Sequence, residues 1–164
     1  MKKLIALTSL FALSLVACSH SVGSGSKETG PIKLGYIGPL TGDAASYGTD
    51  TLNGVQLAIE EINEVGGING REIQLIAEDG RCTGTDAASA AQKLVNVDKV
   101  IAIIGGQCSG ETLAAAPIAE TAGILMLSPL SSSPDVTDAG DFIFRDYPSD
   151  ALETKATAPY FADE

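Results

Sequence analysis

Two short turns rich in hydroxyl groups are the part of this 164-residue chain whose residue types could bind a ligand. The first turn follows the apolar run V-I-A-I-I and reads G-G-Q-C-S-G, with Ser109 just before an alanine-rich segment of helical character. The second turn follows the run I-L-M-L and reads S-P-L-S-S-S-P, with Ser131 and Ser132 at its centre. Hydroxyl groups and unpaired backbone N–H groups at strand ends suit a carboxylate or a phosphate. The sequence therefore predicts a site for a small anionic group.

Each turn also has an interpretation without a ligand. The first turn could be an ordinary connection from a strand to a helix, in which Ser109 only caps the helix. The second could be a flexible linker of serine and proline residues. Both interpretations remain open at this point.

Enzymatic chemistry is disfavoured by the histidine content of the chain. The only histidine is His20, inside a polar stretch rich in glycine and serine at residues 19–30. The folded part therefore has no imidazole to serve as a general base or a metal ligand. No G-x-G-x-x-G follows the first predicted strand, and no G-x-x-x-x-G-K-[ST] occurs. We expect a protein that is not an enzyme and that uses no metal and no cofactor.

The first 17 residues have the features of an export signal. Two lysines precede an apolar run at residues 4–16, which is too short to cross a bilayer as a helix. The run ends in L-V-A-C, which is similar to a bacterial lipobox. We expect cleavage before Cys18 and acylation of its thiol, with a plain secretory signal and a free Cys18 as the alternative. Residues 18–30 would then form a flexible, lipid-anchored tether, and the protein would be exported, either periplasmic or on the cell surface.

The net charge of the chain indicates which partners it can bind, and its cysteine content indicates whether a disulfide forms. The formal net charge is −11 at pH 7, so the chain repels nucleic acid and we expect no nucleic-acid partner. In an exported protein with Cys18 acylated, only Cys82 and Cys108 remain. They follow the second and third predicted strands, so we expect a disulfide that joins two neighbouring turns at one edge of the sheet. Two buried free thiols are the alternative. A catalytic Cys108 is disfavoured because no nearby group could activate it.

The spacing of apolar residues predicts strands and helices in alternation. Helical spacing from Leu52 to Ile62 predicts a helix after Gly48. Pro117 predicts a kink or a late start in the last full helix. The order of elements predicts an α/β fold, a doubly wound parallel sheet with helices on both faces. The expected strands are residues 32–37, 72–78, 100–104, 124–128 and 142–145, and the further helices are residues 86–97 and 112–122.

A family resemblance rests on seven motifs in the order G-P-L-T-G, Y-G, A-I-E-E-I-N-E-V-G-G-I-N-G, D-G-R-C, I-I-G-G-Q-C-S-G, G-I-L-M-L-S-P and F-R. With these motifs the chain resembles the N-terminal lobe of the branched-chain amino-acid binding proteins, type 1 periplasmic receptors of ABC importers. The resemblance covers residues 31–150, which we take as the ligand-binding lobe. It implies capture of branched-chain or related small amino acids or amides outside the cytoplasmic membrane, and an ABC permease complex as partner.

The resemblance also implies roles for single residues. In the family, hydroxyl groups at the positions of Ser109 and Ser132 hold the ligand's carboxylate, and the backbone carbonyl at the position of Leu130 binds part of the ammonium. An aromatic residue at the position of Tyr47 lines the side-chain pocket. Ser131 belongs to the same serine turn, and we include it in the candidate site. The family's disulfide also matches the two cysteines paired above.

The sequence departs from the family in two respects. Glu153 and Thr154 stand where the family has glutamine and glycine. The second lobe, which in the family supplies the other jaw of the cleft and an acidic partner for the ammonium, is absent from this sequence. We interpret residues 151–164 as the start of the connection to that missing lobe, and the chain as a truncated form. A lipoprotein that uses the same lobe for sensing or interaction, without transport, is the alternative.

Overall fold

A single parallel sheet forms the centre of the protein in the computed structural model, which describes residues 29–162. The strand order is β2-β1-β3-β4-β5 and every neighbouring pair is parallel, which confirms the predicted α/β class. The export signal, Cys18 and most of the tether lie outside the described residues. The strands are β1 (Ile32–Gly38), β2 (Ile73–Asp79), β3 (Ala102–Gly105), β4 (Leu125–Ser128) and β5 (Ile143–Arg145).

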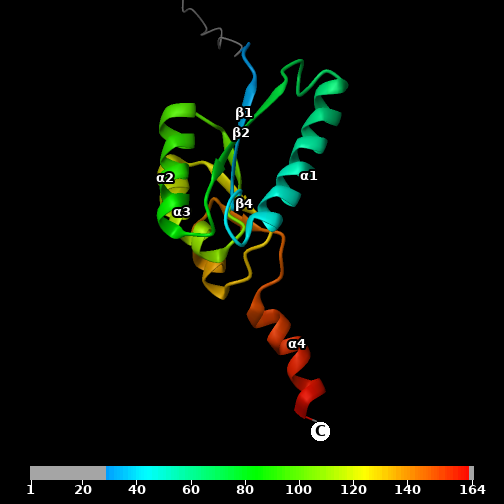
Figure 1. Ribbon diagram of the computed structural model, residues 1–164, viewed down its shortest axis with the longest axis vertical. Coiled ribbons are helices and arrows are strands. Elements are labelled where there is room, and N and C mark those ends of the chain that lie inside the picture. The colour runs from blue at the N-terminus through cyan, green and yellow to red at the C-terminus, as the bar shows by residue number, and fades with distance from the viewer. Residues whose placement is uncertain (1–28, 163–164) are drawn as a thin grey trace, which may run out of the picture.

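Helices cover both faces of this sheet, as the doubly wound prediction requires. Figure 1 shows α2 and α3 together on one face and α1 on the other, while α4 leads away from the sheet. The helices are α1 (Ala45–Glu64), α2 (Gly84–Lys93), α3 (Ser109–Ala122) and α4 (Asp150–Ala162). A π-helical turn, Leu94–Asp98, follows α2, and a short 3₁₀ helix, Pro134–Asp138, precedes β5.

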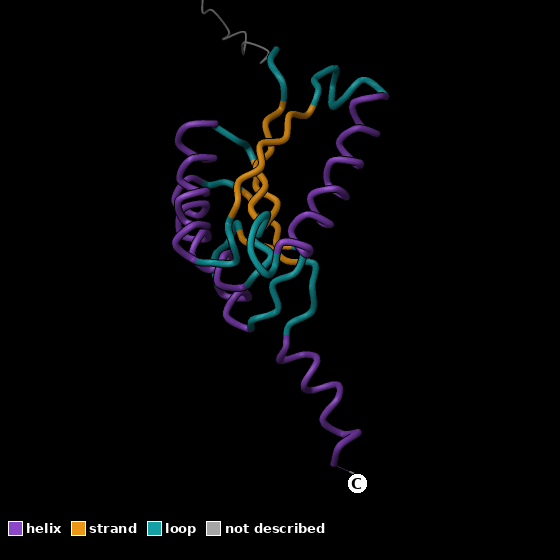
Figure 2. Tube along the Cα trace, viewed as in Figure 1, coloured by secondary structure: helices purple, strands orange, loops and turns teal. Residues whose placement is uncertain are grey.

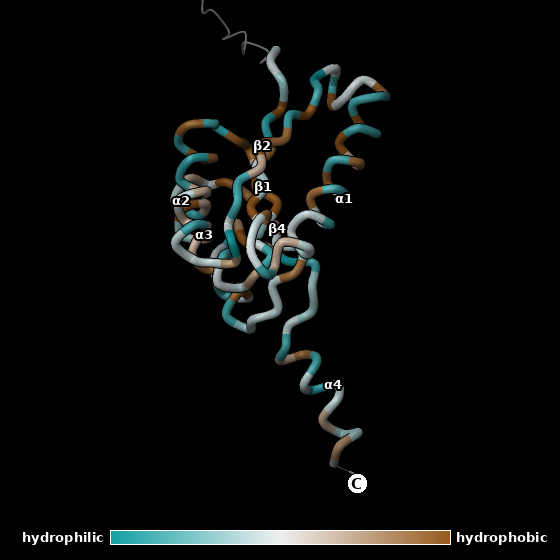
Figure 3. Tube along the Cα trace, in the orientation of Figure 1, coloured by the Kyte–Doolittle hydropathy of each residue, from teal (hydrophilic) through white to brown (hydrophobic). Residues whose placement is uncertain are grey.

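The main core lies between the sheet and the pair α2 and α3. Ile37, Ile103 and Met126 point to this side from three adjacent strands and are completely buried. The facing sides of α2 and α3 are built from alanines, whose small side chains let both helices lie close to the sheet and to each other. A smaller cluster, Ile32, Ile59 and Ile73, packs under α1. Figure 3 shows the apolar residues on the strands, with polar and apolar residues mixed along α1.

The α1 side of the sheet is only partly covered. Helix α1 packs on β1 and β2, whereas the apolar side chains that β4 and β5 present to this side stay open. Leu125 is 44% exposed and Phe144 is 49% exposed. An apolar groove of about 450 Å³ lies between α1 and the sheet and includes Val55, Ile62 and Ile104. This uncovered face follows from strand alternation, because Met126 and Ile143 point into the main core and their neighbours must point the other way.

Two helices have other boundaries than the spacing of apolar residues predicts, because the turns at their ends decide where each helix begins and ends. Helix α1 begins at Ala45, ahead of the expected Gly48, and passes close to the end of β1. A Cβ atom at Gly48 would lie 1.9 Å from the Pro39 carbonyl oxygen, so glycine is what allows this close approach. The helix expected at residues 86–97 divides into α2 and the π-helical turn, which ends at Lys99 in the left-handed conformation.

The segment around β3 and α3 also differs from the prediction. Strand β3 begins at Ala102, two residues later than expected, and α3 begins at Ser109 in place of Thr112. Pro117 lies inside α3 without ending the helix, so the predicted late start is wrong and a kink stays a prediction. The earlier start of α3 matters for function, because it places the first candidate turn directly at a helix N-terminus.

Candidate functional site

Strands β3 and β4 are neighbours, so the two candidate turns lie side by side at the carboxyl edge of the sheet. Figure 2 shows the loops that follow the strands gathered at this end. The backbone N–H of Ser133 donates to the Ser109 hydroxyl oxygen at 3.1 Å, which joins the first turn directly to the second. Ser109 is the first residue of α3 and Cys108 is the capping position, so the alternative in which Ser109 only caps the helix is wrong. Its hydroxyl accepts a hydrogen bond from the second turn and keeps its own proton to donate.

A buried hydroxyl network holds the two turns together from below. Ser128, at the end of β4, donates to the Gly106 carbonyl at 2.7 Å and accepts from the Ser131 N–H at 3.0 Å. The hydroxyl oxygens of Ser131 and Thr112 lie 2.8 Å apart. Sequence reasoning missed Ser128 and Thr112; the signals were a hydroxyl residue at the end of β4 and another in the first turn of α3, the helix that follows β3.

The three candidate residues of the second turn differ in accessibility. Ser131 is 1% exposed and its hydroxyl lies within this network, so its side chain supports the turn from inside. Leu130 and Ser132 are half-buried. The Ser132 carbonyl accepts the Asp150 N–H at 2.9 Å, which ties the start of α4 to this turn. Within the described residues, the Ser132 hydroxyl makes no hydrogen bond and is available to a ligand.

The first turn of α3 offers unpaired backbone donors next to these hydroxyls. The N–H groups of Ser109 and Gly110 have no hydrogen-bond partner in the part of the chain that the structure describes, as expected for the first residues of a helix. They carry the positive end of the helix dipole. The hydroxyls and these N–H groups together form an arrangement that can accept a carboxylate.

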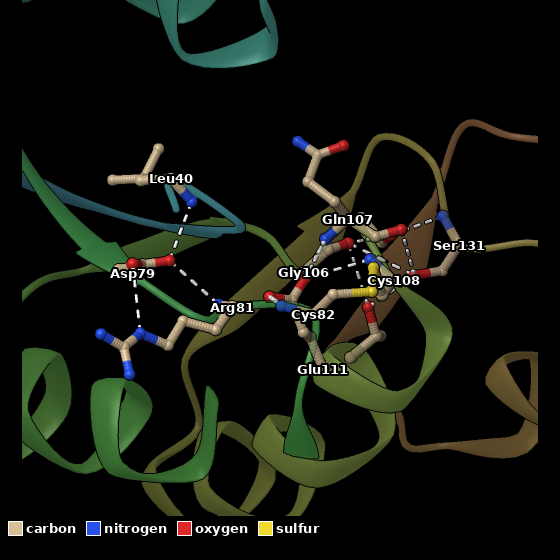
Figure 4. Close-up of a disulfide and its surroundings, with 11 residues drawn as sticks. Leu40, Asp79, Arg81, Cys82, Gly106, Gln107, Cys108, Glu111 and Ser131 are labelled. Carbon is tan, nitrogen blue, oxygen red and sulfur yellow. Dashed lines mark hydrogen bonds and ion pairs between the residues drawn. A yellow bond between two sulfur atoms is a disulfide. The ribbon is translucent and has the colours of Figure 1, made fainter. Parts of the chain in front are cut away.

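Glu111 is a buried carboxylate behind this helix end. It is completely buried, and it accepts hydrogen bonds from the N–H groups of Gln107 at 2.9 Å, Cys108 at 3.0 Å and Cys82 at 2.9 Å (Figure 4). Burial raises the pKa of Glu111, and the three N–H donors oppose that rise. A Cβ atom at Gly80 would lie 2.2 Å from the Glu111 Oε1 atom, so this glycine makes room for the carboxylate. Sequence reasoning missed this residue.

The expected disulfide between Cys82 and Cys108 is present, with the Cα atoms 5.3 Å apart (Figure 4). The two turns that it joins are not neighbours in the sheet, which corrects that part of the expectation. Cys82 follows β2 and Cys108 follows β3, and β1 lies between these strands. The disulfide therefore spans the end of β1 and fixes the carboxyl edge across three strands.

Asp79 connects the turn after β1 to the turn after β2. It accepts the Leu40 N–H at 2.8 Å and the Arg81 N–H at 3.0 Å, as well as the Thr41 hydroxyl. Burial raises the pKa of Asp79, but these hydrogen bonds outweigh burial and hold the pKa below its usual range. The motifs G-P-L-T-G and D-G-R-C thus meet through one carboxylate.

Tyr47 lies in the first turn of α1 and is 62% exposed. A buried chain of hydrogen bonds fixes this turn. The Tyr36 hydroxyl donates to the Gly48 carbonyl at 2.6 Å and accepts from the Gln107 side-chain amide at 3.1 Å. The residue next to Tyr47 is thereby linked to the first candidate turn, although Tyr47 itself stays open. Tyr36 is a further residue that sequence reasoning missed.

Comparison with known proteins identifies the family of this chain. A family model described as "Periplasmic binding protein" matches residues 31–164. The chain belongs to the periplasmic binding protein family. A leucine-, isoleucine-, valine-, threonine-, and alanine-binding protein of Pseudomonas aeruginosa is 34% identical over 96% of this chain and 41% of its own length.

Solved structures of this family share the fold. A branched-chain amino acid transporter substrate binding protein of Streptococcus pneumoniae, in complex with isoleucine, is 33% identical with a TM-score of 0.72 over 77% of this chain and 38% of its own. A solute binding protein of an ABC transporter of Rhodopseudomonas palustris, in complex with 3,4-dihydroxy benzoic acid, is 28% identical with a TM-score of 0.67 over 73% of this chain and 32% of its own.

The chain matches only part of the length of each of these relatives. The chain spans about two fifths or less of the length of these relatives. The Pseudomonas aeruginosa relative is described as an amino-acid binding protein, and the two relatives with solved structures are described as substrate- or solute-binding proteins of transporters. Within residues 29–162, no helix combines the length and the apolar character needed to cross a membrane.

Proposed function

We propose that this chain is the N-terminal lobe of a binding protein that captures branched-chain or related small amino acids for an ABC importer. The observation that carries the proposal is the contact between the two candidate turns, made by the Ser133 N–H and the Ser109 hydroxyl. The Ser132 hydroxyl, on the residue next to Ser133, and the unpaired N–H groups at the start of α3 support a ligand site at this contact. The relatives in complex with an amino acid support the ligand class.

In this proposal the carboxylate of the amino acid binds the Ser109 and Ser132 hydroxyls and the N-terminus of α3. The Leu130 carbonyl accepts a hydrogen bond from the ammonium group, and Tyr47 lines the pocket for the ligand's side chain. Ser131 acts indirectly, because its buried hydroxyl holds the turn that carries Leu130 and Ser132. Each charge-assisted hydrogen bond contributes about 1.5–3 kcal/mol where water is excluded.

The lobe by itself presents half of a cleft, so its affinity is low. Water screens the hydrogen bonds of an open half-site, and no carboxylate of this site is free to pair with the ammonium. Association also costs several kcal/mol of translational and rotational freedom. We therefore expect a dissociation constant of about 1 mM or weaker, equivalent to about −4 kcal/mol. A second lobe would close the cleft and strengthen the same contacts.

The experiment is a titration of residues 19–164 with leucine, isoleucine and valine, followed by NMR spectroscopy of the protein. The expected result is shifts of the Ser109, Gly110 and Ser132 amide signals that saturate in the millimolar range. Glycerol at the same concentrations is the control for nonspecific effects. Shifts spread over the surface without saturation would overturn the proposal, and micromolar saturation would show that the lobe forms a complete site on its own.

Localisation follows from the same proposal. We propose export, acylation of Cys18, and attachment to a membrane through the tether at residues 18–30. The permease complex of the importer is the expected protein partner. The lobe would then hold its carboxyl edge, with the candidate site, at the end of the sheet opposite the start of β1, where Thr29 and Gly30 lead into the strand (Figure 1).

A further inference from the structure

The carboxylate of Glu111 is a negative group that the proposed binding scheme does not use. It lies on the first turn of α3, two residues after Ser109, and is completely buried. Its two oxygens accept three backbone N–H groups, from Gln107, Cys108 and Cys82. Amide groups that surround a helix N-terminus are the usual donors for a bound anion. At this helix end, part of that donor set is already taken by a group of the protein itself.

The hydrogen-bond pattern favours the ionised form of Glu111. Both of its oxygens face N–H donors, and a carboxylic acid would need an acceptor for its own proton. Within residues 29–162, no acceptor is hydrogen-bonded to either oxygen. The other titratable groups that face this carboxylate are Asp79, which pairs with Arg81 at 3.6 Å, and Tyr36. These donors thus stabilise a negative charge behind the N-terminus of α3, against the burial that raises the pKa of the Glu111 carboxyl.

A negative charge at this position weakens the binding of ligands to different degrees, depending on the net charge of each ligand. A carboxylate bound at Ser109 shares the helix end with Glu111, and two like charges in a partly buried site repel each other. A zwitterionic amino acid brings its own ammonium group, which offsets that repulsion. A ligand with a carboxylate and no ammonium does not.

We propose that Glu111 is a specificity-determining residue that makes the site favour zwitterionic amino acids over carboxylate anions of the same shape. The inference rests on the proposed function and deepens it, because it names the charge class of the ligand. Glu111 acts on the ligand through charge, without touching it.

The test compares isoleucine with the 2-oxo acid of the same carbon skeleton, which has a net charge of −1. The two dissociation constants are measured by NMR titration on residues 19–164 of the wild type and of the Glu111→Gln variant. The expected result is a preference for isoleucine in the wild type and a drop of about tenfold in that preference in Glu111→Gln, because the like charge is gone. Asp135→Asn is the matched control: it removes an exposed negative charge near the second turn, and the preference should stay unchanged.

Two further measurements test the inference independently of the Glu111→Gln variant. Glu111→Asp keeps the charge and should keep the preference. If Glu111→Gln does not fold, the wild type is titrated between pH 7 and pH 4, where protonation of Glu111 should lower the preference for isoleucine. An isoleucine preference that neither Glu111→Gln nor low pH alters overturns the inference and leaves the proposed function standing. Failure of isoleucine to bind the wild type at all overturns the proposed function, and the inference with it.

Discussion

The hydroxyl oxygen of Ser109 accepts the backbone N–H of Ser133 at 3.1 Å, across the gap between the turns that follow β3 and β4. A hydroxyl that accepts in this way has one proton left, and that proton can only be donated away from Ser133. In the proposed binding scheme Ser109 therefore has two separable roles: it fixes the second turn, and it donates a hydrogen bond to the ligand. Ser132 has only the second role in that scheme, since its hydroxyl has no partner among the described residues.

This difference predicts unequal effects of two similar substitutions. Ser109→Ala should lower the free energy of unfolding by about 1 kcal/mol, because the half-buried Ser133 N–H loses its acceptor. Ser132→Ala should change that free energy by less than about 0.5 kcal/mol. Both should weaken isoleucine binding by about fivefold or more. Denaturant unfolding and NMR titration measure the two quantities, and equal stability losses in the two variants would contradict the assignment.

Asp79 predicts a pH-dependent contribution to stability. The pKa of this carboxyl is lowered in the folded state, so its contribution is present above the ordinary pKa of 3.8 and is lost as the pH falls through the lower folded pKa. Asp79→Asn should cost about 1 kcal/mol at pH 7, a value reduced for solvent screening because the side chain is partly exposed. The cost should be smaller at pH 3, below the ordinary pKa, than at pH 7, and it should keep shrinking as the pH falls through the lower folded pKa. Asp43→Asn, in the adjacent exposed loop, is the control in urea unfolding at both pH values.

The disulfide predicts a large loss of stability on reduction, without loss of the fold. Closing a loop over a sequence separation of 26 residues stabilises the folded state by about 3 kcal/mol in the chain-entropy account. Glu111 joins the same two turns through hydrogen bonds, so the reduced sheet should persist. Unfolding in urea with and without a phosphine reductant measures the difference. Alkylation of both Cys82 and Cys108 in a non-reduced sample would show that the bond is absent in the protein.

The uncovered side of the sheet predicts binding of an apolar dye. Leu125 and Phe144 present exposed apolar surface next to the groove under α1, so the fluorescence of ANS should rise on addition of the folded protein. Replacing both residues with serine should reduce that rise by about half. Replacing Tyr160 and Phe161, which are exposed on α4, serves as the control. A larger effect from the α4 pair would place the dye site elsewhere.

The lipobox predicts attachment to a membrane. Cys18→Ser should prevent acylation and move the protein from the membrane fraction to the soluble fraction of cells that export it. Labelling with a radioactive fatty acid should mark the wild type and leave the variant unmarked. Ser19→Ala is the control, because it keeps the thiol. Unchanged membrane association of Cys18→Ser, together with equal labelling, would contradict the prediction.

Local sequence patterns determined much of this fold. Strand periodicity reports which residues are buried, and it placed all five strands within two residues of their observed starts. The pairing of Cys82 with Cys108 followed from counting, since only two thiols remained. Ser109 and the serine turn were found because turn residues that follow strands are recognised by type and order. Each of these features depends on a few neighbouring residues.

Tertiary structure alone decided how these pieces meet. The placement of β1 between β2 and β3 depends on the path of each crossover, which no local pattern encodes. Because of this placement, the disulfide joins turns that are separated by a strand, and not the neighbouring turns that the sequence predicts. Ser131 and Ser132 look alike in the sequence, yet the turn directs one hydroxyl inward and leaves the other open. Glu111 lies just before the helix expected at residues 112–122, and no local pattern marks it. Two N–H groups from the turn just before it and the N–H of Cys82, 29 residues away, surround this buried carboxylate, because side-chain environment is set by packing and not by residue type.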